Sequence, residues 1–212
     1  MLKATLVSVM LFTLLLSVCT LAMGQAEQFL VGYWPFDEGS GKEAKDVSGN
    51  GNDGELIDGP KWVAGKYEKA LEFAGGSYVN VPDDPSLDLI DAATVMCWFK
   101  LTDDLTATTR IMSKNNSIFV IFDFGNPGTL DFLVKPNNDF VESTTIFDVG
   151  EWYHFAGTFD KGEMKIYING ELEGEKKNAV GIDPSDLELW IGADDWQPPG
   201  SSFSGVIDDV RF

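Results

Sequence analysis

Short apolar runs separated by turn residues dominate the chain after its first 28 residues. Along Met164–Ile168 apolar and polar residues alternate, which is the period of a strand with one buried face. Asn169-Gly170 follows and favours a two-residue hairpin turn, because both residues tolerate positive φ. Ser117–Phe124 is almost continuously apolar, which is typical of a central strand covered on both faces. No window of a dozen residues shows the 3.6-residue period of an amphipathic helix. The pattern therefore predicts an all-β domain.

The same signals predict strands along the whole chain, each bounded by Gly, Pro, Asn or Asp. The expected strands are Phe29–Phe36, Ala70–Phe73, Tyr78–Val81, Thr94–Leu101, Arg110–Lys114, Ser117–Phe124, Thr129–Val134, Ser143–Phe147, Trp152–Phe159, Met164–Ile168, Glu171–Glu175, Leu187–Ile191 and Gly205–Phe212. Many short strands with regular turns indicate a sandwich or a barrel.

The N-terminal residues have the pattern of a secretory signal. Lys3 supplies the positive start, Leu6–Leu21 is an uncharged apolar run, and Ala22-Met-Gly24 offers small residues for cleavage. We expect a signal peptide over residues 1–26 and one domain over residues 27–212. A retained membrane anchor is the alternative, although the run is short for a spanning helix. The expected location is extracellular, with the periplasm or the cell surface as further options.

Charge narrows the range of partners. The chain carries 15 basic and 34 acidic residues, a formal net charge of −19, and removal of Lys3 with the signal makes it −20. Such a charge repels polyanions, so nucleic acid and anionic membranes are poor partners.

Cys97 is the one cysteine outside the signal, so an intrachain disulfide is excluded in the mature chain. Its apolar strand predicts a small buried hydrophobic residue.

Five segments in order carry a resemblance to a known family. They are Asp46-Val-Ser-Gly-Asn-Gly-Asn-Asp-Gly54, Ala70-Leu-Glu-Phe73, Trp152-Tyr-His-Phe-Ala-Gly-Thr-Phe-Asp160, Met164-Lys-Ile-Tyr-Ile-Asn-Gly-Glu-Leu172 and Phe203-Ser-Gly-Val-Ile-Asp-Asp-Val-Arg-Phe212. Together they resemble the laminin G-like domains of the concanavalin A-like lectin/glucanase superfamily. The resemblance covers about residues 29–212 and implies a jelly-roll β-sandwich of two antiparallel sheets. It also implies that the first and last strands lie side by side in one sheet.

A structural calcium site is the first chemical hypothesis. Asp208-Asp-Val-Arg211 is similar to the ending of laminarinase-type glucanases, in which the matching aspartate ligates a structural calcium. The resemblance implicates Asp208 with Asp37 and Glu38, and adds Asp46 from the glycine-rich turn. Calcium prefers such hard oxygen ligands. The alternative is that the Asp46–Gly54 residues only cap and turn the backbone. Neighbouring strand residues alternate between faces, so we expect only one of Asp208 and Asp209 to face a given site.

Catalytic motifs are missing from the sequence. Retaining glucanases of the superfamily that this chain resembles carry a Glu-x-Asp-x-(x)-Glu run, and this run does not occur here. Glu171, Glu173 and Glu175 are expected to share one solvated strand face. His154 is the single histidine, and we expect a structural role for it on the strand face of Trp152, Ala156 and Thr158. The sequence therefore favours a protein that is not an enzyme.

One loop offers a candidate ligand site. Trp196 lies among Asp194, Asp195 and Gln197, so an indole ring could stack on a sugar while oxygens accept its hydroxyl protons. The alternative is that Trp196 folds back over the sheet edge. The combined interpretation is a secreted, non-catalytic module that recognises a glycan and holds a structural Ca²⁺. An adhesion or assembly module that binds an extracellular protein is the second hypothesis, and an unusual glycoside hydrolase is the third.

Overall fold

The computed structural model describes residues 29–105, 108–122, 126, 128–194 and 202–212. The chain separates into two units, Met1–Leu30 and Val31–Phe212. The second unit contains every strand described below. The expected signal peptide, residues 1–26, lies outside the described residues.

Sixteen strands and one short 3-10 helix, η1 (Pro85–Leu87), form within the described residues. The strands are β1 (Tyr33–Trp34), β2 (Glu43–Ala44), β3 (Gly54–Ile57), β4 (Lys61–Ala64), β5 (Lys69–Phe73), β6 (Tyr78–Val81), β7 (Ala92–Leu101), β8 (Arg110–Lys114), β9 (Ile118–Phe122), β10 (Leu130–Val134), β11 (Asp139–Glu142), β12 (Trp152–Asp160), β13 (Glu163–Ile168), β14 (Glu171–Lys176), β15 (Leu189–Ile191) and β16 (Gly205–Arg211).

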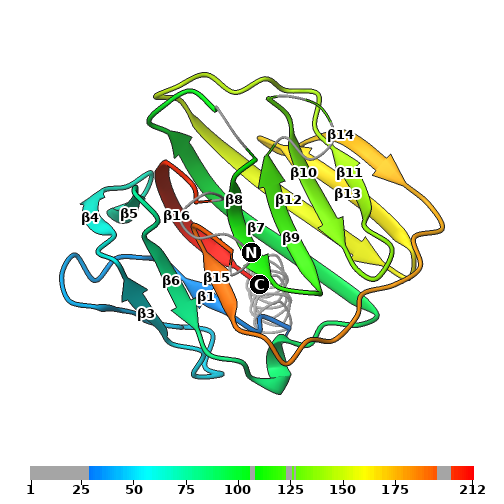
Figure 1. The fold of residues 1–212 in the computed structure, drawn as a ribbon, viewed down its shortest axis with the longest axis horizontal. Helices are drawn as coiled ribbons and strands as arrows, with labels where there is room; N and C mark the ends of the chain where they lie inside the picture. Colours follow the sequence, from blue (N-terminus) through cyan, green and yellow to red (C-terminus); the bar gives the residue numbers. More distant parts are fainter. Residues whose placement is uncertain (1–28, 106–107, 123–125, 127, 195–201) are drawn as a thin grey trace, which may run out of the picture. The chain divides into compact units, whose positions relative to one another are not determined.

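These strands form two antiparallel sheets of eight strands each in the described part of the chain. Sheet A has the order β14-β13-β12-β7-β16-β5-β4, with β1 paired to β16, and sheet B has the order β11-β10-β9-β8-β15-β6-β3-β2. Figure 1 shows β16, in red, beside β1, in blue. The predicted pairing of the first and last strands is therefore confirmed, as is the jelly-roll sandwich.

Apolar residues from alternate strand positions fill the space between the sheets. On β7 the residues Val95, Cys97 and Phe99 are buried while their neighbours are at least partly exposed. Phe99 contacts the rings of Phe122 and Phe147 at centroid separations of 5.7 and 5.3 Å. Such edge-on aromatic contacts add to the free energy gained by burying the rings. Cys97 is buried in this core, as its apolar strand predicted. Burial raises the pKa of its thiol.

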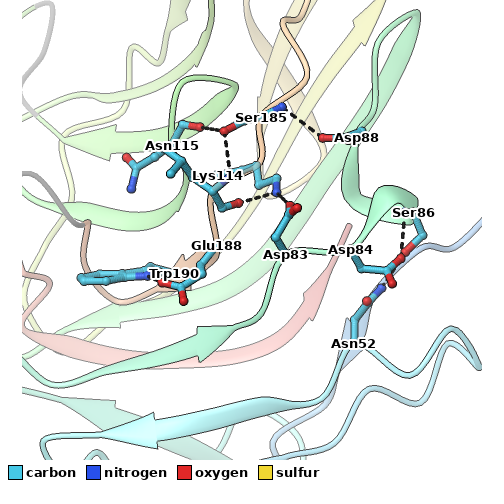
Figure 2. Close-up of polar contacts among 11 residues, drawn as sticks. Asn52, Asp83, Asp84, Ser86, Asp88, Lys114, Asn115, Ser185, Glu188 and Trp190 are labelled. Carbon is cyan, nitrogen blue, oxygen red and sulfur yellow. Dashed lines mark hydrogen bonds and ion pairs between the residues drawn. The ribbon is translucent and has the colours of Figure 1, made fainter.

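A buried lysine holds the end of β8. The Lys114 ammonium donates to the Asp83 carboxylate and to the Leu187 carbonyl (Figure 2). The Lys114 side chain is fully buried. Ser185 joins the same network by donating to the Asn115 carbonyl. Because a buried ammonium is costly unless it is paired, this cluster has a structural role.

Several strand predictions were wrong in position. Ser143–Phe147 is not a strand, and the preceding β11 occupies that place in sheet B. The short strands β2, β3 and β4 were missed, because their few apolar residues lie among turn-forming Gly, Pro and Asp. Sheet pairing, which the local pattern does not contain, decides these segments.

The expected shared face of Glu171, Glu173 and Glu175 was also wrong. A register shift opposite Ile166 and Tyr167 leaves Glu173 without a partner on β13. Its carboxylate accepts hydrogen bonds from the Thr144 and Thr145 amides at 2.8 and 2.9 Å. Glu173 therefore ties a loop to the sheet edge.

Candidate functional site

The register of three adjacent strands of sheet A aligns His154, Trp98 and Asp208. His154 on β12 faces Trp98 on β7, and Trp98 also faces Asp208 on β16. The flanking residues Phe155 and Phe99 point into the core, so this row lies on the outer face of sheet A. Directly opposed side chains in antiparallel strands have Cβ atoms about 5 Å apart. The pairing thus brings an imidazole, an indole and a carboxylate into contact range.

A β-bulge turns a second carboxylate to the same place. Between Asp208 and Arg211 the register with β7 shifts, and Asp209 has a positive φ of 54°. Because the bulge breaks the alternation of side chains, both Asp208 and Asp209 line one hollow. The expectation that only one of them would face a given site was therefore wrong.

The turn between β4 and β5 covers Asp208. The backbone amides of Lys66 and Tyr67 donate to Asp208 Oδ2 at 2.8 and 3.0 Å, whereas Oδ1 is buried and accepts no hydrogen bond. A Cβ atom at Gly65 would lie 2.7 Å from Asp208 Oδ2, so glycine lets this turn approach. Burial raises the pKa of Asp208 to about 6, although the two amides oppose the rise.

Aromatic rings surround these carboxylates. The Trp98 ring meets Tyr67 edge-on at 6.1 Å and His154 edge-on at 5.1 Å between centroids. The Lys66 ammonium lies 4.4 Å above Trp98, and the Arg211 guanidinium lies 4.5 Å above Tyr33. Both are cation–π geometries.

The hollow is open to solvent and has a volume of about 630 Å³, within the usual range for small-molecule sites. Besides the residues above it is lined by Pro35, Asp37, Asn169 and Gly170. Arg211 donates to Asp209 at 3.0 Å and to the Tyr33 hydroxyl at 3.2 Å, which fixes that wall. The hollow thus combines flat apolar rings with hydrogen-bond acceptors and a few donors.

His154 also lines the hollow. Its amide donates to Asn169 Oδ1 at 2.9 Å, which couples it to the hairpin turn between β13 and β14. Burial lowers the pKa of the imidazole, against the opposing effect of Asp209. His154 lies on the strand face that the sequence predicted, and the lowered pKa favours its neutral form.

The four predicted calcium ligands do not converge. Asp37 and Asp208 line the hollow, while one Glu38 oxygen accepts from the Lys45 amide and the other is buried without a hydrogen bond. Asp46 accepts from the Tyr33, Ser48 and Asn52 amides, so both of its oxygens hold the turn. No group of three or more His, Cys, Asp or Glu that could hold a metal occurs in the described ranges.

The predicted ligand loop falls largely outside the described residues, since Asp195, Trp196 and Gln197 belong to the undescribed range 195–201. Asp194 is described and is 1% exposed. Its carboxylate lies 2.5 Å from Arg110 Nε. The expectation that Asp194 accepts hydroxyl protons from a bound sugar is thus corrected, because its carboxylate forms a buried ion pair.

Comparison with known proteins gives the family. The model of the concanavalin A-like lectin/glucanases superfamily matches residues 73–212, about two thirds of the chain. The chain belongs to this superfamily. No curated protein matches it. Within the described residues, no helix is long and apolar enough to cross a membrane.

Solved structures share the fold. Domain 4 of an extracellular arabinanase from Geobacillus stearothermophilus, in complex with arabinotriose, is 23% identical, with a TM-score of 0.69 over 86% of this chain and 90% of that one. The binding domain of Paraclostridial mosquitocidal protein 1 is 17% identical, with a TM-score of 0.70, and the match covers 87% of this chain and 48% of that one. A sialidase from Trypanosoma rangeli is 14% identical, with a TM-score of 0.63, and the match covers 87% of this chain and 30% of that one. The chain thus spans less than half of the toxin domain and under a third of the sialidase.

Proposed function

We propose that the domain is a non-catalytic carbohydrate-recognition module and that the hollow on the outer face of sheet A binds the glycan. The observation that carries the proposal is the row of His154, Trp98 and Asp208, which the strand register places around one concave space. A sugar presents an apolar ring face and a rim of hydroxyl groups. Indole rings pack against the first, and carboxylate oxygens accept protons from the second.

The charge of the hollow favours an uncharged sugar. Asp37, Asp208 and Asp209 contribute three carboxylates, and Arg211 is already paired with Asp209. The chain as a whole has a formal charge of −19. An acidic sugar would be repelled both by the carboxylates of the hollow and by the net negative charge of the chain, which costs binding free energy. Neutral oligosaccharides are therefore the proposed ligand class.

Lys66 sets a condition on binding. Its ammonium covers one face of Trp98 at 4.4 Å, where a sugar would stack. The ligand must displace this flexible side chain or accept a hydrogen bond from it. Because exposed cation–π contacts are worth only about 0.5–1 kcal/mol, displacement is a modest cost.

The structural relatives support this proposal through the fold they share. The arabinanase domain carries arabinotriose, and this chain covers most of its length. At 23% identity the likeness does not carry a ligand over, but it makes neutral arabino-oligosaccharides a sensible first set of probes.

Export and a structural calcium ion complete the proposal. Asp37 and Asp208 would hold the ion, because each lines the hollow and Asp208 Oδ1 is a buried acceptor without a hydrogen bond. Calcium would stabilise the native state by binding to it and not to the unfolded chain. Chelation with EDTA should then lower the melting temperature, and millimolar calcium should restore it. A melting temperature that does not respond would remove calcium from the proposal.

A glycan array followed by calorimetry tests the central claim. The purified protein should bind a neutral glycan, and Trp98→Ala should weaken that affinity by about 2 kcal/mol, roughly 30-fold, as expected for a central aromatic contact. Tyr167→Ala, on the same face of sheet A at β13, is the matched control and should bind normally. A blank array, or equal binding by Trp98→Ala, would contradict the proposal and favour a protein-binding module. Release of reducing sugar would contradict its non-catalytic part.

A further inference from the structure

A second aromatic platform lies one register row beyond the hollow. Trp152 precedes His154 by two positions on β12, so both side chains lie on the outer face of sheet A. Trp152 faces Lys100 on β7, just as His154 faces Trp98. The two rows are therefore about 7 Å apart along the strands, a step comparable to one sugar residue in an extended chain.

The second platform repeats the chemistry of the first. The Lys100 ammonium lies 5.0 Å above the Trp152 ring, as the Lys66 ammonium lies 4.4 Å above Trp98. Both indoles are partly exposed. Lys100 also faces Val206 on β16, which is buried at 4% exposure. Each row thus offers a ring for stacking and a lysine that can donate to a ring or hydroxyl oxygen.

Core packing does not account for Trp152. The two inward-facing residues that follow it on β12, Tyr153 and Phe155, contact the aromatic core, whereas Trp152 faces outward. A large aromatic ring on an outer sheet face beside a concave site is a common feature of ligand surfaces.

We propose that the glycan site continues from the hollow onto Trp152, so that the ligand is an oligosaccharide bound across at least two rings and not a single terminal sugar. This inference rests on the proposed function. In it, Trp98 holds the residue in the hollow, and Trp152 stacks a residue further along the same chain.

Calorimetry with two length series tests the extension. The probes are arabinose to arabinotetraose and glucose to cellotetraose, measured with the wild-type protein, Trp152→Ala, Trp152→Phe and Tyr167→Ala. In the wild type, affinity for the bound series should rise on the order of tenfold once the oligosaccharide reaches Trp152. Trp152→Ala should lose that gain and keep its affinity for the shortest bound sugar. Trp152→Phe, which keeps a ring, should retain most of the gain, and Tyr167→Ala should match the wild type.

Each remaining outcome contradicts a different claim. Equal affinity for all lengths would overturn the second platform and leave the hollow as a site for one sugar. A length gain that persists in Trp152→Ala would place the second contact elsewhere. No binding in either series would overturn neutral-glycan recognition together with its extension. Even if a Trp152 variant folds poorly, a flat wild-type length profile would overturn the extension.

Discussion

Asp46 offers a direct test of whether the glycine-rich turn is held by hydrogen bonds or by a metal. Its Oδ1 accepts from the Tyr33 and Ser48 amides at 2.9 and 2.8 Å. Its Oδ2 accepts from the Ser48 hydroxyl and the Asn52 amide at 2.8 and 2.9 Å. All four bonds join one carboxylate to the turn and to the start of β1. Removal of the carboxylate should therefore loosen both.

The magnitude follows from this count. A hydrogen bond to a charged group contributes about 1.5–3 kcal/mol, and the four bonds here share one partly buried acceptor, so they are not additive. Water can replace part of the loss on the exposed side. We expect Asp46→Ala to lower the free energy of unfolding by about 3 kcal/mol, and Asp46→Asn, which keeps one acceptor oxygen, by about half of that. For a domain of this size the alanine variant should melt roughly 6–12 °C lower.

Urea unfolding measured with EDTA and with calcium is the assay. Glu43→Gln is the control, because its ion pair with Lys45 is solvent-exposed and should change stability by no more than about 0.5 kcal/mol. If the turn is held by hydrogen bonds, Asp46→Ala should lose the same stability in both buffers. A loss under about 1 kcal/mol in EDTA, or one present only with calcium, would refute this reasoning.

Acidity adds a second check on Asp46. Burial raises the pKa of this carboxyl, but the hydrogen bonds from Ser48, Tyr33 and Asn52 lower it more, so its pKa in the native state lies below the ordinary value. Its contribution is complete above about pH 4 and is lost as the pH falls through the lower native pKa. The stability difference between wild type and Asp46→Asn should therefore shrink in acid.

Three further predictions concern other residues. Burial raises the pKa of Asp208 to about 6, so the native state binds a proton that the unfolded chain lacks between about pH 4 and 6, and stability from this group falls as the pH rises through that range. In EDTA, Asp208→Asn should remove this pH dependence, so its free energy of unfolding relative to the wild type should be higher at pH 7 than at pH 4.5. The same difference between the two proteins at both pH values, measured by urea unfolding, would contradict the prediction. Glu173→Ala should speed hydrogen exchange at the Thr144 and Thr145 amides, which Glu173 holds, whereas Glu171→Ala should not, and equal exchange in both variants would exclude the tether. The buried Cys97 thiol should react with Ellman's reagent only after unfolding, so rapid reaction of the native protein would show that the core opens.

The sequence predicted the strands whose apolar pattern is long or continuous. Tyr78–Val81 and Arg110–Lys114 form strands with the expected bounds, and Ile118–Phe122 is a central strand buried on both faces. In these segments local pattern and tertiary environment agree. The two-residue β1 shows the opposite case, because only the pairing with β16 defines it.

The hollow could be predicted only in part. The alternation in β12 placed His154 on the correct face, and the resemblance to glucanases pointed to Asp208 and Asp37. Trp98 could not be assigned to the site from its strand alone, because the sequence does not say which strand lies beside which. The bulge that turns Asp209 into the hollow also depends on pairing, since a single inserted residue is visible only against a partner strand.

The position of β16 within sheet A has a consequence for how the domain folds. This strand lies between β7 and β5, and Gly205 faces Leu101, 104 positions earlier in the chain (205 minus 101). Until β16 inserts, β7 and β5 remain two open sheet edges that no local contact can close. Such distant closure slows folding, and open edges can pair with other chains in the meantime. We therefore expect a slow, concentration-sensitive refolding reaction whose rate-limiting step is the docking of this one strand.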